Sequence, residues 1–129
     1  MTDDSFQLLQ EDTNTKHLKL RLRGLEDFQR EIHAVAVEHG FWQAGHKSPL
    51  ECIALMHSEL SEAAEEFREA IPQLYYEVNG KPEGVGPELA DVILRILDFA
   101  EHYKIDLVGA LVKKNEYNKT RPWLHGKVK

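Results

Sequence analysis

The sequence is poor in cysteine and has no long apolar stretch. Its single cysteine, Cys52, cannot form a disulfide within the chain, and this is typical of proteins in a reducing compartment. No apolar run approaches the roughly 18 residues that a membrane-spanning helix needs, and no signal-peptide pattern is present. We therefore expect a soluble, cytoplasmic protein with no membrane partner.

Basic residues are outnumbered by acidic ones. The 129 residues include 16 Lys and Arg against 22 Asp and Glu, which gives a net charge of −6. This balance argues against binding to nucleic-acid polymers, because their phosphates must be neutralised by a basic surface. The length predicts one domain. The hydrophobic content of 42% is sufficient for a core, and 29% of charged residues fits a helical protein.

The signatures of several metal and nucleotide sites are also missing. None of the seven histidines follows a Glu at a distance of three residues, which argues against a di-iron bundle, and HExxH is absent. His57-Ser58-Glu59 lacks the cysteine pair of a zinc deaminase. Gly84-Val85-Gly86 is only a fragment of a phosphate-binding glycine loop. We expect structural or rim positions for His57, His102 and His125 rather than metal ligation, and His125 is the strongest candidate for an exception.

Apolar periodicity and terminal signals predict four main helices, at roughly residues 25–39, 49–70, 87–103 and 107–118. Ser48 before Pro49 is the clearest start signal, because it combines an N-cap residue with proline at the first helical position. Asp106 provides an N-cap for the last helix. Residues 72–86 are rich in turn formers and carry a hairpin signal at Asn79-Gly80.

The first 23 residues are predicted to form an arm that precedes a domain at residues 24–129. Residues 1–15 are polar and show no sustained periodicity, so we expect them to be mobile. Lys16–Arg23 alternates charged residues with leucine, and this period of two predicts a short strand or an extended segment. A charged linker is the alternative.

Two acidic motifs have helical spacing. Glu59-Leu60-Ser61-Glu62 and Glu88-Leu89-Ala90-Asp91 each place two carboxylates on one face of a helix, and Arg95 and Asp98 continue the second stripe. The rest of residues 88–100 is mostly apolar, so this helix should be buried on most of its circumference. Carboxylates at a buried edge repel one another by about 4 kcal/mol per close pair, and they need a cation. Ligands that are all carboxylates favour Mg²⁺ or Mn²⁺ over zinc.

In their order and spacing, these motifs resemble the MazG-like, all-α nucleoside triphosphate pyrophosphohydrolases. The resemblance covers roughly residues 25–127, with its strongest parts at 55–67, 81–100 and 114–127. The last stretch contains the Lys-x-x-Tyr-Asn-x-x-Arg element of that family. Many members carry a further Glu directly before the first motif, where this chain has Ser58.

The resemblance implies an all-α fold, a four-helix MazG-like bundle with a short N-terminal arm. It also implies Mg²⁺-dependent hydrolysis of (deoxy)nucleoside triphosphates to monophosphate and pyrophosphate, as house-cleaning of the nucleotide pool. The catalytic residues and metal ligands would be Glu59, Glu62, Glu88 and Asp91, with Mn²⁺ as an alternative ion. Because the apolar surface of the third expected helix exceeds what a small bundle covers, we expect a homodimer or a homotetramer formed as a dimer of dimers.

The C-terminal segment is expected to bind the phosphates of the nucleoside triphosphate. Lys114, Asn118 and Arg121 recur at i, i+4 and i+7, which is one face if the helix continues. Their cations and amide suit a triphosphate, whose charge the metal neutralises only in part. The resemblance adds Tyr117 at the aromatic position of the element. His125 is a further candidate for substrate binding.

An aromatic loop precedes the first acidic motif. The resemblance places this region near the nucleobase, so Trp42 is expected to stack on a base. The alternative is that Phe41 and Trp42 close the end of the bundle.

A non-enzymatic function is the competing interpretation. The same carboxylates can form an acidic seam through which a helical interaction module binds a basic partner. Release of pyrophosphate from a panel of triphosphates in the presence of Mg²⁺ distinguishes the two functions.

Overall fold

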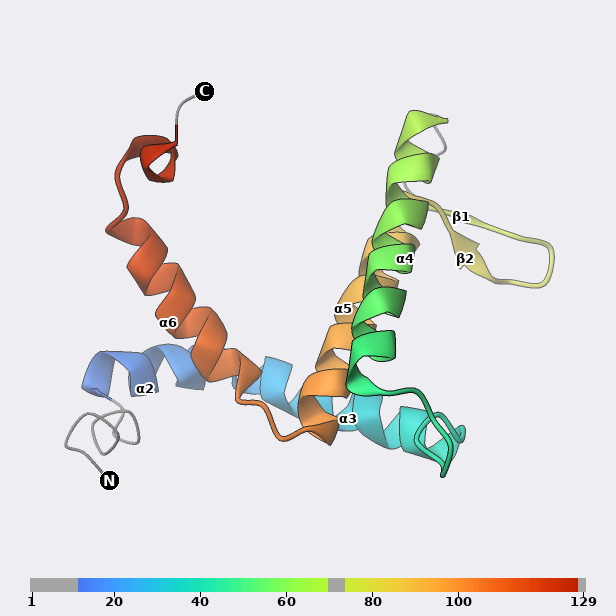
Figure 1. The fold of residues 1–129 in the computed structure, drawn as a ribbon, viewed down its shortest axis with the longest axis horizontal. Coiled ribbons are helices and arrows are strands. Elements are labelled where there is room, and N and C mark those ends of the chain that lie inside the picture. Colours follow the sequence, from blue (N-terminus) through green and yellow to red (C-terminus); the bar gives the residue numbers. More distant parts are fainter. Residues whose placement is uncertain (1–11, 70–73, 128–129) are drawn as a thin grey trace. The chain divides into compact units, whose positions relative to one another are not determined.

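The computed structural model describes residues 12–69 and 74–127, and within these ranges the fold is all-α apart from one short hairpin (Figure 1). The elements, in chain order, are α2 (Thr13–Arg21), α3 (Arg23–Glu38), α4 (Pro49–Arg68), β1 (Tyr75–Tyr76), β2 (Pro82–Glu83), α5 (Val85–His102), α6 (Leu107–Lys119) and the 3₁₀ turn η1 (Trp123–Gly126). The predicted all-α class is therefore confirmed. None of the described helices combines the length and apolarity needed to cross a membrane.

The chain divides into two compact units. One consists of the described parts of residues 1–28 and 105–129, and the other of residues 29–104 with the same restriction. In the first unit, α2 packs against α6, whose Val108 and Val112 are buried. Lys19 Nζ lies 3.0 Å from Asp106 Oδ2, which ties the two helices together.

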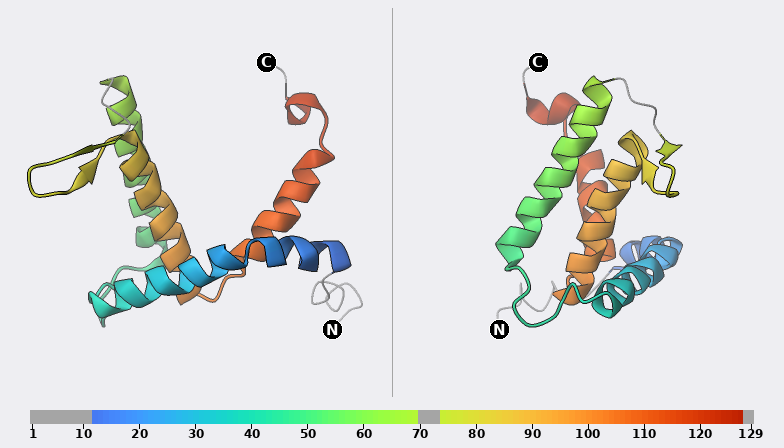
Figure 2. Two further views of the ribbon diagram at one scale, coloured as in Figure 1. Left: turned by 180° about the vertical axis from the view of Figure 1, so that it is seen from behind. Right: turned by 90° about the vertical axis from the view of Figure 1, so that its right-hand side faces the viewer.

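The second unit is organised around α4 and α5. These helices lie side by side in both views of Figure 2 and make the main helix–helix contact of the unit. Ala63 of α4 and Leu97 and Ala100 of α5 are buried. Gln29 Nε2 donates a hydrogen bond to Glu101 Oε2 at 3.0 Å, which attaches α3 to α5. This packing fixes the two helices that carry the acidic motifs.

The predicted helix boundaries are confirmed to within two residues for α3, α4, α5 and α6. Ser48 caps α4, because its Oγ accepts a hydrogen bond from the Glu51 N–H at 3.2 Å. Asp106 caps α6 in the same way, through a hydrogen bond from the Gly109 N–H to its Oδ1 at 3.0 Å. Gly40 follows α3 with a φ of 83°, a left-handed conformation that favours glycine.

The prediction of an extended segment over Lys16–Arg23 is wrong, because α2 covers most of it and α3 begins at its last residue. Asp12 caps α2 by accepting a hydrogen bond from the Thr15 N–H at 2.7 Å. Leu18 and Leu22 are four residues apart, so the alternating pattern also fits one face of a helix. Lys, Leu and Arg are moreover good helix formers. The part of the predicted arm at residues 1–11 lies outside the described residues.

The hairpin signal at Asn79-Gly80 is confirmed. β1 and β2 pair antiparallel with Tyr75 opposite Glu83. The Glu77 N–H donates a hydrogen bond to the Lys81 carbonyl at 2.9 Å, which closes the turn. The hairpin places Glu83 in a defined position directly before α5.

Candidate metal centre

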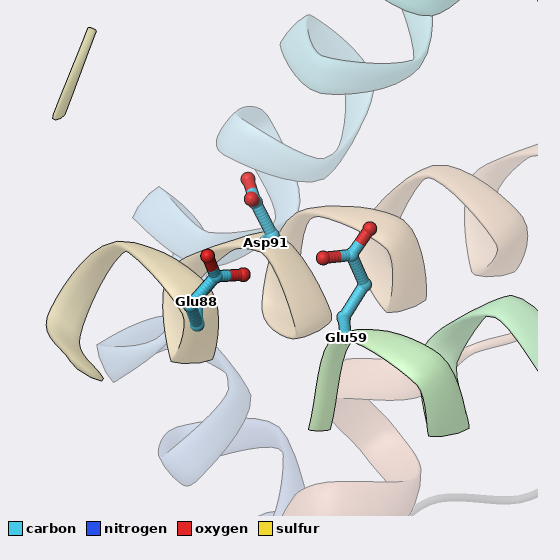
Figure 3. A group of neighbouring side chains, drawn as sticks. All are labelled: Glu59, Glu88 and Asp91. Carbon is cyan, nitrogen blue, oxygen red and sulfur yellow. The ribbon is translucent and has the colours of Figure 1, made fainter. Parts of the chain in front are cut away.

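Facing turns of α4 and α5 bring three of the four predicted metal ligands together. Figure 3 shows the carboxylates of Glu59 from α4 and of Glu88 and Asp91 from α5 gathered around one space. One oxygen of each lies within 4.8 Å of the other two, so a single cation can contact all three. Glu88 and Asp91 share a face because they are three residues apart, and the packing of α4 on α5 supplies Glu59.

Glu88 is the most buried residue of the three. It is 8% exposed, and its Oε2 has no hydrogen-bond partner among the described residues. Burial, followed by the neighbouring Glu62 carboxyl, raises the pKa of Glu88 to about 7. Burial and then Glu59 also raise the pKa of Asp91. A bound divalent cation would offset both effects, because it favours the ionised carboxylates.

Arg95 supplies positive charge to this group from within the protein. Its Nη2 and Nε lie 2.7 Å and 2.9 Å from Glu59 Oε1. Arg95 also counteracts the rise in the pKa of Asp91 that burial and Glu59 cause. The Arg95 side chain is 42% exposed, whereas that of Glu59 is 14% exposed, so the ion pair lies at the edge of the group with its cation on the solvent side. The sequence placed Arg95 on the acidic stripe but did not show this pairing.

Glu62, the fourth predicted ligand, lies at the border of the group. It is exposed, and it does not belong to the set of three carboxylates within 4.8 Å. Its carboxyl is nevertheless close enough to Glu88 to raise the pKa of that residue. The structure therefore assembles three of the predicted ligands tightly and leaves Glu62 beside them.

A second group of carboxylates shares Glu88 with the first. One oxygen each of Glu66, Glu83 and Glu88 lie within 4.8 Å of one another. Glu83 is buried, and its Oε1 forms an ion pair with Lys81 Nζ at 2.6 Å. Sequence reasoning missed Glu83, because helical spacing does not relate a loop residue to a helix. The hairpin signal at Asn79-Gly80 was the available clue, since it turns the chain back toward the start of α5.

A cavity of about 360 Å³ is lined in part by Asp91, one of the three clustered carboxylates. Most of its lining is apolar or aromatic and includes Trp42, Met56 and Leu94. Asp98 contributes a carboxylate at another part of the wall. Cavities of this size accommodate small ligands when a few polar groups fix their orientation. The protein thus offers an apolar surface directly beside the carboxylates.

Trp42 is held in the cavity wall by polar and stacking contacts. Its Nε1 donates hydrogen bonds to Asp98, at 2.9 Å to Oδ1 and 3.0 Å to Oδ2. Its ring stacks on His102 with the centroids 3.6 Å apart and the planes at 11°. His33 Nδ1 donates a hydrogen bond to the same Asp98 at 2.7 Å, which fixes that carboxylate. These contacts are compatible with both predicted roles of Trp42.

The predicted phosphate-binding residues belong to the other unit. Lys114, Tyr117 and Asn118 lie on α6, and Arg121 follows its end. Lys114 Nζ and Arg121 Cζ lie 5.5 Å and 6.0 Å from the centre of the Tyr117 ring, so these three side chains come together. His125 lies in η1, and its side chain is outside the described part of the chain. That these residues and the carboxylates bind the same nucleoside triphosphate stays a prediction.

Comparison with known proteins gives no match for this chain, either to a family model, to a curated protein or to a solved structure. The resemblance to the MazG-like pyrophosphohydrolases therefore rests on the sequence motifs alone.

Proposed function

We propose that the protein is a Mg²⁺-dependent pyrophosphohydrolase of (deoxy)nucleoside triphosphates with a MazG-like four-helix bundle. The observation that supports the proposal best is the group of Glu59, Glu88 and Asp91, in which Glu88 Oε2 is buried and has no hydrogen-bond partner within residues 12–69 and 74–127. Burying a carboxylate without a partner costs free energy, which a bound cation recovers.

The residues of the group fit Mg²⁺ or Mn²⁺, because they offer only carboxylate oxygens. Bound there, the ion would polarise a phosphate and lower the pKa of a water molecule. Glu59, Glu88 and Asp91 would hold it, while Glu62 beside them would complete the ligands or accept the proton of the attacking water. The water oxygen bonds to the α-phosphorus and the bond to the bridging oxygen breaks, which yields monophosphate and pyrophosphate.

The two ends of the substrate would contact different groups. The cavity beside Asp91 would receive the base, since the Trp42 indole is already oriented by Asp98 and His102 and offers a preformed stacking surface. The phosphates would be bound by the C-terminal residues Lys114, Tyr117, Asn118, Arg121 and His125. Charge-assisted hydrogen bonds from Lys and Arg are suited to the phosphate charge that the metal leaves unneutralised.

We further propose that the protein assembles as a homodimer or homotetramer through α4 and α5. Large apolar side chains on these helices remain exposed, among them Leu50 at 79%, Phe67 at 77% and Ile93 at 55%. A second copy of the chain carries the same apolar surfaces, and symmetric packing of identical surfaces is the commonest way to cover them. Light scattering should give a multiple of the 14.9 kDa chain mass, and a monomer at micromolar concentration contradicts this assembly.

A panel of canonical, deoxy- and modified nucleoside triphosphates tests the proposed reaction. With Mg²⁺ present, at least one of them should release pyrophosphate, and EDTA should stop the release. Glu65→Gln is a matched control, because Glu65 lies on α4 but pairs with Arg68 at 2.9 Å, and it should retain full activity. Absence of pyrophosphate with every triphosphate would instead favour the interaction module with an acidic seam. The panel also reveals which base is preferred.

A further inference from the structure

We propose that Asp98 selects the nucleobase, and that the preferred base carries an exocyclic amino group, as cytosine and adenine do, in place of the carbonyl group of uracil, thymine or hypoxanthine. The inference deepens the proposed function, because it rests on the base entering the cavity whose wall contains Trp42 and Asp98. Asp98 lies outside both acidic motifs and outside the C-terminal segment. Its role is therefore separate from metal binding and from phosphate binding.

The metal-ligand group leaves Asp98 available to a base. Among the described residues that line the cavity, Asp91 and Asp98 carry the carboxylates. Asp91 belongs to the group with Glu59 and Glu88, whereas Asp98 belongs to no such group. Asp98 follows Asp91 by seven residues on α5, which is about two helical turns. The Asp98 side chain is 18% exposed, so part of it can be reached by a ligand.

The Asp98 carboxylate is fixed in orientation but can accept a further hydrogen bond. Its Oδ1 accepts from His33 Nδ1 at 2.7 Å and from Trp42 Nε1 at 2.9 Å. Its Oδ2 accepts from the same Trp42 N–H at 3.0 Å and from no second donor among the described residues. An ionised carboxylate offers about four acceptor positions. One position on Oδ2 thus remains for a donor from the ligand.

Trp42 brings a stacked base close to this carboxylate. The indole N–H points at both oxygens of Asp98, so the carboxylate lies at the edge of the ring. His102 covers one face of the indole, with the ring centroids 3.6 Å apart. A base that stacks on the indole would therefore use the other face. Its polar edge can then extend to Asp98.

A carboxylate at this position distinguishes amino from carbonyl groups, because it only accepts hydrogen bonds. The amino groups of cytosine and adenine are donors, and Asp or Glu that accepts from the cytosine amino group is an established pairing. A carbonyl oxygen facing Asp98 would be repelled and would leave a buried acceptor without a partner. The N3–H of uracil or thymine lies between two carbonyl groups, so it approaches Asp98 only with the same repulsion.

The test is calorimetric binding of matched deoxynucleoside monophosphates to the full chain in Mg²⁺. dCMP and dUMP differ only in the amino or carbonyl group at ring position 4 and the accompanying proton on N3, and dAMP and dIMP form the equivalent purine pair. In at least one pair the amino nucleotide should bind about tenfold or more tightly, the effect of one hydrogen bond to a charged group. Preference for the amino nucleotide in neither pair, or no binding of any of the four at millimolar concentration, overturns the proposal.

Asp98→Asn should abolish the preference, because the amide replaces one acceptor oxygen by a donor and keeps the shape of the side chain. The ratio of the two affinities should fall from about tenfold to about one or below. Glu101→Gln is the matched control. Glu101 lies one turn further on α5, binds Gln29 and is not part of the cavity wall, so this variant should keep the wild-type ratio. An unchanged ratio in Asp98→Asn, or an equal loss in Glu101→Gln, contradicts selection by Asp98.

Trp42→Phe distinguishes contact of Asp98 with the base from an indirect effect through Trp42. Phenylalanine keeps an aromatic ring but has no N–H for Asp98. Both nucleotides should bind more weakly to this variant, and the preference for the amino nucleotide should remain. If Trp42→Phe removes the preference as completely as Asp98→Asn does, Asp98 only positions Trp42 and the proposal is refuted.

A third nucleotide tests the inference without any substitution, and so holds even if Asp98→Asn does not fold. The deoxynucleoside monophosphate of 2-pyrimidinone or of unsubstituted purine carries hydrogen in place of the amino or carbonyl group. It should bind about tenfold more weakly than the amino nucleotide of the preferred pair, because the donor to Asp98 is gone. Binding as tight as that of the amino nucleotide overturns the proposal.

Pyrophosphate release from the corresponding triphosphates separates failure of this inference from failure of the proposed function. Selective binding of the amino nucleotide without hydrolysis of any triphosphate would retain the role of Asp98 and refute the reaction. Hydrolysis of triphosphates without preference between amino and carbonyl nucleotides would retain the reaction and refute the role of Asp98.

Discussion

Replacing Glu88 with glutamine should make the metal-free protein more stable at neutral and alkaline pH. Glu88 is 8% exposed, its Oε2 has no partner among the described residues, and its pKa is raised from the ordinary 4.5 to about 7, chiefly by burial. A difference of about 2.5 in pKa between the folded and unfolded states corresponds to about 3 kcal/mol of unfolding free energy. This is a large part of the stability of a typical domain.

The sign follows from the order of the two pKa values. Below about pH 4.5, Glu88 is protonated in both states, so its ionisation costs nothing. Between about pH 4.5 and 7 the unfolded state releases its proton first, and the free energy of unfolding falls as the pH rises. Above about pH 7 the full cost is present. Glutamine carries no charge at any pH, so Glu88→Gln avoids this loss.

Urea denaturation of both proteins in EDTA, across about pH 4.5 to 8, measures the effect. The free energy of unfolding of the variant should rise relative to that of wild type as the pH rises. At the upper end of the pH range, the variant should be more stable by about 3 kcal/mol. Glu65→Gln should show no such pH-dependent gain. Saturating Mg²⁺ should favour wild type instead, because only wild type keeps the ligand. If the difference in unfolding free energy between the two proteins does not depend on pH, the raised pKa of Glu88 is refuted.

Three further substitutions test other parts of the site. Trp42→Ala should raise KM about tenfold if the indole stacks on the base, since such stacking is worth roughly 1–3 kcal/mol. A lower melting temperature with unchanged KM would show instead that Trp42 only closes the end of the helices. Arg121→Ala should lower kcat/KM about 10- to 100-fold with little change in melting temperature, and Arg121→Lys should recover only part, because lysine cannot make two parallel hydrogen bonds to phosphate. Unchanged kinetics would exclude the C-terminal segment from the site. Arg95→Met should tighten Mn²⁺ binding about threefold in a titration, since Arg95 competes for Glu59 Oε1; weaker binding would mean that Arg95 positions Glu59.

Local signals in the sequence were sufficient to predict most helices. Ser48 with Pro49 marks the start of α4, and Asp106 marks that of α6, because an N-cap acts on backbone groups only two or three residues away. The prediction for α2 was wrong because another local pattern was followed in place of its cap. There the short alternation of leucines suggested a strand, although the cap at Asp12 and the helix-forming residues that follow it select a helix.

The candidate site could be predicted only where its residues share a helix or a known motif. Glu88 and Asp91 follow from spacing on α5, and the resemblance pairs them with Glu59. The participation of Glu83 depends on the hairpin that carries it to the start of α5. The pairing of Arg95 with Glu59 depends on how α4 packs against α5. Such contacts between elements are not encoded in any local pattern.

Phosphorus NMR of a nucleoside triphosphate incubated with Mg²⁺ and the protein tests the proposed reaction most directly. Metal-dependent cleavage between the α- and β-phosphates predicts monophosphate and pyrophosphate in equal amounts with wild type. With Asp91→Asn or Glu62→Gln, neither product should form, although circular dichroism should show that both variants are folded. Diphosphate with orthophosphate as products, or wild-type turnover by both variants, would contradict a pyrophosphohydrolase that acts through these carboxylates.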